Sequence, residues 1–153
     1  MPTITPFLWF DNQAEEAMQF YASIFKSAKV LNVQHAGDRV MFVEFELEGQ
    51  RFMGLNAGPH HKFNEAVSFF VKVQTQQEVD DLWARLTTGG GAPGQCGWLK
   101  DKYGLSWQII PEALPRLIAG SDPARAQRAM QAMMGMTKID VAQLQQAYDA
   151  GHG

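Results

Sequence analysis

The sequence predicts an α+β fold made of two tandem β-α-β-β-β modules followed by a helical C-terminal tail. The main observation is a repeat, because a strand-then-helix unit near the start of the chain returns about sixty residues later. Short β-rich stretches follow each helix of the repeat, and turns that contain glycine separate these stretches. Beyond Pro111 the pattern changes to helix alone. A fold built from two copies of one unit has a seam, and we expect a ligand cavity there.

The first module covers about residues 1–57. Its first strand, over residues 3–10, is followed by Asn12 and Glu15 at the spacing of a capping box, which predicts a helix that continues to Ile24. An antiparallel meander follows, in which apolar and polar residues alternate and short turns connect the strands. The predicted strands of the meander are residues 28–35, 40–47 and 50–57.

The second module covers about residues 66–111, after a linker at residues 58–62. A strand leads to Thr75 and Glu78, a second capping box, and to a helix that ends before the glycine run 89–91. Two short strands flank the turn 101–104. The predicted strands are residues 66–73, 96–100 and 105–111.

Apolar residues of the two modules correspond at a constant offset along the chain. The corresponding pairs are Phe7 with Phe69, Ala17 with Val79, Phe20 with Leu82, Tyr21 with Trp83, and Ile24 with Leu86. The capping boxes are offset by one residue more than these pairs, so we expect the strand-to-helix loops to differ slightly.

The tail, about residues 112–150, has no counterpart in the first half. Asp122 and Pro123 are typical of a helix start, and this helix is expected to end at Gly135. A last helix is expected from about Asp140. We expect the tail to pack on the body of the protein or on a partner subunit.

Composition excludes several function classes. The chain has 153 residues, a formal net charge of −3 and no basic run, which argues against binding to nucleic acid or to an anionic membrane surface. The single cysteine, Cys96, excludes an intrachain disulfide and fits a reducing compartment. No apolar stretch is long enough to span a bilayer, and the N-terminus lacks the features of a signal peptide. The sequence therefore predicts a cytoplasmic protein.

Several stretches resemble the PhnB-like group of the vicinal-oxygen-chelate superfamily, which includes glyoxalase I, bleomycin-resistance proteins and extradiol dioxygenases. The stretches are PFLWFDNQAEEAMQFYASIF from residue 6, FMGLNAGPHHKFNEAVSFF from residue 52, CGWLKDKYGLSWQIIP from residue 96 and RAMQAMMGMTKIDVAQLQQAY from residue 128. The group also carries a demethylubiquinone methyltransferase label. The resemblance implies a cavity on the concave face of the paired modules, a small-molecule ligand and a homodimer.

The resemblance also implies four metal-ligand positions, which fall on Pro6, Met53, Ser68 and Gln108. Proline and methionine are not ligands for a hard divalent ion, and serine and glutamine are poor substitutes for a carboxylate. We therefore predict no metal site of the usual kind and no cofactor.

A small polar ligand would be oriented by neutral hydrogen-bonding groups in an apolar cup. Ser68 and Gln108 fit this role, although they could instead bond each other or a buried water. The predicted ligand-binding residues are Ser68, Gln108, Met53, Phe70 and Leu8.

The candidate catalytic residues are His60, His61, Cys96 and Lys100. Each has a simpler explanation: a solvated linker for the histidines, apolar filling for the thiol and a solvated strand edge for the lysine. The glycine run 89–91 follows a helix, whereas a dinucleotide loop follows a strand. A methyltransferase role therefore rests on the family label alone.

Three functions remain open from the sequence. The first is binding of a small, partly apolar molecule without the four-ligand metal site. The second is an enzyme of the lyase, isomerase or dioxygenase kind, with or without a metal, that acts on a small molecule. The third is a structural or interaction protein whose tail makes the contacts.

Overall fold

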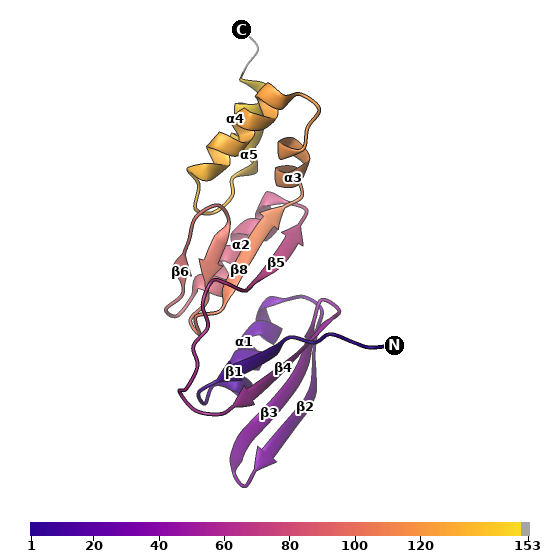
Figure 1. The fold of residues 1–153 in the computed structure, drawn as a ribbon, viewed down its shortest axis with the longest axis vertical. Helices are drawn as coiled ribbons and strands as arrows, with labels where there is room; N and C mark the ends of the chain where they lie inside the picture. The colour runs from indigo at the N-terminus through magenta and orange to yellow at the C-terminus, as the bar shows by residue number, and fades with distance from the viewer. Residues whose placement is uncertain (151–153) are drawn as a thin grey trace. The chain divides into compact units, whose positions relative to one another are not determined.

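The computed structural model describes residues 1–150, which form two compact units, residues 1–62 and residues 63–150 (Figure 1). Each unit contains a four-stranded mixed sheet with a helix packed on one face. Each sheet follows the order β-α-β-β-β along the chain, so the predicted α+β class and the paired modules are confirmed.

In the first unit the sheet order is β1-β4-β3-β2, with β1 parallel to β4 and the other pairs antiparallel. Alternate residues of β3, Val43, Phe45 and Leu47, are buried, as the alternation of the sequence predicts. Tyr21 of α1 stacks on Phe45 with ring centroids 6.3 Å apart, so this face of the sheet forms the core with α1. The elements are β1 (Phe7–Phe10), α1 (Ala14–Ile24), β2 (Ala28–Ala36), β3 (Arg39–Leu47) and β4 (Gln50–Asn56).

The N-terminus of α1 is capped from a neighbouring strand, and the predicted Asn12–Glu15 capping box is wrong. The N-cap residue is Gln13, which makes no side-chain cap hydrogen bond. Instead, the Ala14 amide donates to the Asn56 side-chain oxygen at 2.9 Å, and the Asn56 amide donates to the Val40 carbonyl at 3.0 Å. A cap supplied by a residue so distant in the sequence leaves no local spacing to recognise.

We expect Asn56→Ala to lower the free energy of unfolding by about 2 kcal/mol, because it removes both the cap and a strand contact. Urea unfolding measures the change. Asn12→Ala is the matched control, since Asn12 is exposed, and should change stability by less than about 0.5 kcal/mol. Equal losses in the two variants would contradict the assigned cap.

In the second unit the sheet order is β5-β8-β7-β6, with β5 parallel to β8. The predicted Thr75–Glu78 capping box is present at the start of α2. The two-residue strand β6 was not predicted, because it is too short to show alternation and exists through its pairing with Leu99 and Lys100. The elements are β5 (Ser68–Val73), α2 (Gln76–Thr87), β6 (Ala92–Pro93), β7 (Trp98–Lys100) and β8 (Ser106–Pro111).

The repeat holds in the helices but shifts by one residue in the first strands. Ala17 and Val79 are both fully buried, as their correspondence predicts. Phe7, however, is 54% exposed and lies beside Met53, whereas Phe69 lies beside the buried Trp107. The first unit has one more residue between strand and helix, and a shift of one residue moves a side chain to the other face of a sheet.

The strand registers therefore change one of the four metal-ligand positions that the resemblance implies. Phe7 beside Met53 corresponds to Phe70 beside Gln108. Ser68 lies two residues before Phe70, and Thr5 lies two residues before Phe7. The counterpart of Ser68 is therefore Thr5 and not Pro6.

The tail forms three helices within the second unit, where they pack on its β-α-β-β-β part. The expected helix starts are confirmed, since the Asp122 carboxylate accepts from the amides of Ala124 and Arg125 and the Asp140 carboxylate accepts from Gln143. The first tail helix was not predicted because it contains Pro115, which stands in its first turn, where a missing amide proton costs little. The tail elements are α3 (Ala113–Ile118), α4 (Pro123–Met134) and α5 (Val141–Asp149).

An apolar cluster and several polar bonds hold the tail helices to the rest of the second unit. Gln76 of α2 donates to the Ile139 carbonyl at 2.9 Å and accepts from the Val141 amide at 2.8 Å. The Lys138 ammonium lies 2.8 Å from the Asp80 carboxylate, and its hydrogen bond lowers the pKa of Asp80. The buried cluster comprises Ile110, Ala113, Leu114, Leu117, Ala129, Met136, Ile139 and Leu144.

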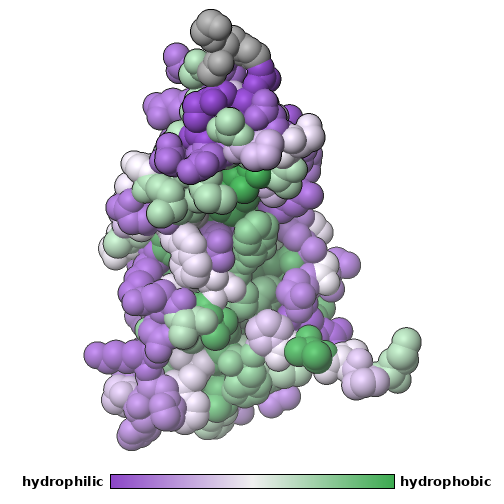
Figure 2. All heavy atoms as spheres, turned by 45° about the horizontal axis from the view of Figure 1, so that its top comes forward, coloured by the Kyte–Doolittle hydropathy of each residue, from purple (hydrophilic) through white to green (hydrophobic). Residues whose placement is uncertain are grey.

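The surface mixes hydrophilic and apolar residues, as Figure 2 shows for one face. Exposed apolar side chains occur on the sheets and on α4, where Met130 and Met134 are 43% and 64% exposed. Within residues 1–150, no helix combines the length and the apolar character needed to cross a membrane.

Candidate functional site

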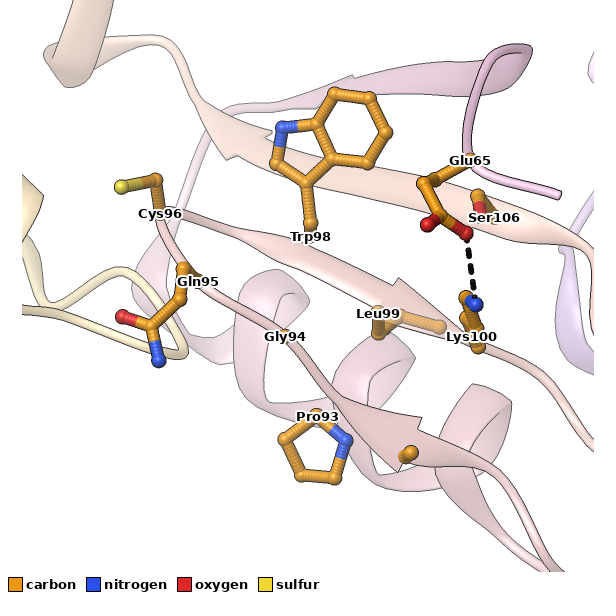
Figure 3. A pocket seen from close by; sticks show the side chains of 10 residues that line it. Glu65, Pro93, Gly94, Gln95, Cys96, Trp98, Leu99, Lys100 and Ser106 are labelled. Carbon is orange, nitrogen blue, oxygen red and sulfur yellow. Dashed lines mark ion pairs between the residues drawn. The ribbon is translucent and has the colours of Figure 1, made fainter.

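A solvent-open cavity of about 530 Å³ lies in the second unit (Figure 3). Strands β7 and β8 form its floor through the face of the sheet that carries Trp98, Lys100 and Ser106. Trp107, one residue along from Ser106, faces the opposite side and is buried. The remaining lining residues are Glu65, Leu99 and residues 92–96.

The hydroxyl of Ser106 is the unusual group in this cavity. Ser106 is 1% exposed, and its Oγ is the one buried side-chain polar atom without a hydrogen-bond partner among the described residues. A buried hydroxyl without a partner costs free energy, so such groups are rare unless something binds them.

An ion pair lies beside Ser106. The Lys100 ammonium is 2.8 Å from the Glu65 carboxylate, and Lys100 is directly opposite Ser106 in the β7–β8 register. The hydrogen bond from Lys100 lowers the pKa of the Glu65 carboxyl below its ordinary value. The two side chains are 47% and 67% exposed, so solvent screens the pair and it stabilises the fold little.

Ser68 and Gln108 lie on this same face of the sheet and bond each other. The Gln108 side-chain amide donates to the Ser68 hydroxyl at 2.9 Å. Ser68 and Gln108 are both half-buried. Phe70, the next residue of β5 on this face, is 58% exposed. The mutual bond that the sequence left open is therefore present.

The other two predicted ligand-binding residues belong to the first unit and lie on opposite faces of its sheet. Met53 is half-buried on the face away from α1, beside Phe7. Leu8 is 6% exposed and pairs with Gly54, whose α-carbon faces the side chains of Phe10 and Ala14 in the core. Leu8 therefore packs under α1, and its role in ligand binding stays a prediction.

Cys96 lines the cavity and has an uncommon backbone conformation. It is half-buried, its φ is +57°, and its amide donates to the Met136 carbonyl at 2.8 Å. In Figure 3 the sulfur points away from Trp98 and from the Glu65–Lys100 pair. The thiol is thus at the rim and not among the cavity's polar groups.

His60 and His61 belong to the first unit and are exposed. The His61 ring meets the Trp9 ring edge-on with centroids 4.7 Å apart, and the Trp9 indole donates to the Gly58 carbonyl at 2.9 Å. The predicted linker is therefore packed against β1. The candidate catalytic residues fall in separate units, with Cys96 and Lys100 in the second.

The residues at the four carried-over positions do not fit a divalent cation. Thr5, Met53, Ser68 and Gln108 offer two hydroxyls, a thioether and an amide, with no carboxylate or imidazole. In the described part of the chain, no group of three histidine, cysteine, aspartate or glutamate side chains is arranged to hold a metal.

A second hollow, of about 860 Å³, lies in the first unit near the start of α1. Its lining is mainly polar and includes Asp11, Glu15, Glu16, Asp38 and Arg39. Unlike the cavity of the second unit, it contains no buried polar side chain that lacks a partner, counting residues 1–150.

Sequence reasoning missed Ser106, Glu65 and Trp98 as parts of one site. Ser106 is the first residue of β8, and with Gln108 it alternates with apolar residues, which was the available signal. Glu65 lies in a loop, and its approach to Lys100 depends on tertiary structure that no spacing reveals.

Comparisons with known proteins agree with the fold described above. The family model described as 3-demethylubiquinone-9 3-methyltransferase matches residues 2–110, so the tail stretch quoted above lies outside the match. A Bacillus cereus PhnB protein, described as a 3-demethylubiquinone-9 3-methyltransferase, is 32% identical, with a TM-score of 0.66 over 72% of this chain and 99% of that chain.

More distant solved structures share the fold. A Pseudomonas aeruginosa protein is 18% identical, with a TM-score of 0.61 over 73% of this chain and 98% of that chain. The fosfomycin resistance protein FosX from Listeria monocytogenes, complexed with Mn(II) and sulfate, is 14% identical, with a TM-score of 0.55 over 71% of this chain and 89% of that chain. No curated protein matches the chain. The predicted glyoxalase and bleomycin-resistance type of fold is confirmed.

Proposed function

Because this chain belongs to the family described as 3-demethylubiquinone-9 3-methyltransferase, of the PhnB-like vicinal-oxygen-chelate kind, we propose that it binds a small, partly apolar molecule in the cavity of its second unit. The observation that carries the proposal is the buried Ser106 hydroxyl, which lines that cavity and lacks a partner in the described structure.

Size and lining support this proposal. Small-molecule sites are about 300–1,000 Å³ and combine apolar walls with a few polar groups, and a cavity of about 530 Å³ falls within that range. Trp98 and Pro93 supply apolar surface, while Ser106 and Lys100 supply polar groups. Binding of this kind does not use the four-ligand metal site.

Catalysis is the alternative function. Lys100 and Cys96 line the cavity and could take part in acid–base or nucleophilic chemistry, whereas His60 and His61 do not line it. A methyl-transfer activity is suggested only by the family's description, and we assign no residue to it. We propose in addition that the protein is cytoplasmic, as the sequence predicts. We also propose that it is a homodimer, which the exposed apolar side chains of Phe7, Met41 and Phe70 support.

The test is the variant Ser106→Ala. Its free energy of unfolding should rise by about 1 kcal/mol, because a buried hydroxyl without a partner is removed. Its affinity for cavity ligands should fall about fivefold, because a hydrogen bond to the ligand is lost. Ligands would come from a fragment library screened by protein NMR, with shifts at the Trp98 indole marking cavity binding.

Ser23→Ala, in the first unit, is the control. Its hydroxyl is exposed and donates to the Phe20 carbonyl at 2.7 Å, so this variant should change stability by less than about 0.5 kcal/mol and should bind cavity fragments as the unaltered protein does. A screen in which no fragment shifts the Trp98 signal would overturn the proposed function.

A further inference from the structure

We propose that the cavity of the second unit binds an organic carboxylate, and that Glu65 occupies the place of the ligand's carboxylate in the ligand-free protein. This inference rests on the proposed function and adds to it the chemical class of the ligand.

The cavity has one charged pair and is otherwise neutral. Of its lining residues, Lys100 is the cation and Glu65 the anion. With Glu65 in place the two charges cancel. When Glu65 moves away, a single ammonium group faces a largely apolar cavity and attracts an anion.

Two donors are arranged for one carboxylate. Lys100 and Ser106 are directly opposite each other on adjacent strands and project from the same face, where opposed residues have Cβ atoms about 5 Å apart. The ammonium already holds a carboxylate at 2.8 Å, while the hydroxyl beside it has no partner within the described chain. In the proposed complex a ligand carboxylate, free of the Glu65 backbone, bonds both donors.

The Glu65 side chain can leave Lys100 at little cost in free energy. It lies in the segment before β5, outside any strand or helix, and its side chain is 67% exposed. An exposed ion pair is easily exchanged for another with the same partner, because water and salt screen it. An exposed glutamate is ionised at neutral pH, and the ionised form is the one that competes with an anionic ligand.

The rest of the cavity favours an apolar, planar body on the ligand. Figure 3 shows the Trp98 ring standing over the cavity floor on the same side as the Glu65–Lys100 pair. An indole face packs well on a flat apolar group. The ligand is therefore inferred to be an aromatic or unsaturated acid.

The experiment compares benzoate with benzamide, which has nearly the same shape and no charge. NMR titrations follow the Trp98 indole signal in the unaltered protein and in two variants. Glu65→Gln should bind benzoate about fivefold more tightly, because the internal competitor is neutralised. Lys100→Met should bind benzoate about fivefold more weakly. Neither variant should change the affinity for benzamide.

Two variants serve as controls for net charge. Lys72→Met removes an exposed lysine from the same sheet, and Glu15→Gln removes an exposed carboxylate from the first unit. Neither should alter the affinity for benzoate. If these controls changed it as much as the Lys100 and Glu65 variants, the proposed pairing would be wrong.

The outcomes separate this inference from the proposed function. Equal affinity for benzoate and benzamide, unaffected by Glu65→Gln, would overturn the carboxylate inference and leave cavity binding intact. Neutral fragments that bind at Trp98 when benzoate does not would do the same. Only the lack of any cavity ligand would overturn both.

Discussion

Replacing Gly97 with alanine is expected to lower the free energy of unfolding by about 3 kcal/mol. The φ of Gly97 is +87°, a left-handed conformation that costs about 1–2 kcal/mol for a residue with a side chain. An added Cβ would also lie 2.8 Å from Ile110 Cδ1 and 3.1 Å from Ile139 Cγ1, so the buried cluster beneath the tail would have to move. Urea unfolding followed by tryptophan fluorescence measures the loss.

Gly104→Ala separates the two causes. Gly104 has nearly the same φ, +88°, but an added Cβ would meet no atom within 4 Å. It should therefore lose only the conformational cost of about 1–2 kcal/mol. If both alanine variants lost the same free energy, the close packing of the tail against Gly97 would not contribute.

Replacing Asp101 with alanine should also destabilise the protein by about 3 kcal/mol, because it leaves buried donors unpaired. Asp101 is 3% exposed. One carboxylate oxygen accepts from the amides of Tyr103 and Leu105 at 2.9 and 3.1 Å, and the other accepts from the Trp107 indole at 2.9 Å. These bonds close the turn between β7 and β8, the strands that form the cavity floor.

Asp101→Asn tests the charge and the indole contact separately from the turn. Its oxygen can still accept from the two amides, but its amide group would face the indole donor, so a smaller loss of about 1–2 kcal/mol is expected. Asp38→Ala, in the exposed turn between β2 and β3, is the control and should change stability by less than about 0.5 kcal/mol. A similar small effect of Asp101→Ala would mean that its bonds contribute nothing.

The fold was largely predictable because its signals are local. Thr75 with Glu78 and Asp122 with Pro123 mark helix starts through neighbours in the sequence, and the structure has both. Where a cap came from a distant strand, as with Asn56, the local pattern pointed to the wrong residue. The one-residue shift in the first strands places one more residue between strand and helix in the first unit, where the sequence had predicted only that the two loops differ slightly.

The site was less predictable because its groups meet only in three dimensions. Ser68 and Gln108 were recognised from the resemblance, and the structure joins them. Ser106 and Glu65 carry no motif, and their importance appears only from burial and from the distance to Lys100.

The bonds between the cavity rim and the tail have a consequence for synthesis on the ribosome. The amides of Cys96 and Gly97 donate to the carbonyls of Met136 and Thr137, and Gln76 bonds Ile139 and Val141. A nascent chain that has exposed the sheet of the second unit still lacks these acceptors. Since domains fold during translation from the N-terminal end, the rim can be completed only when the last helices emerge. A binding-competent rim thus first exists when residues 136–141 have joined the sheet of the second unit.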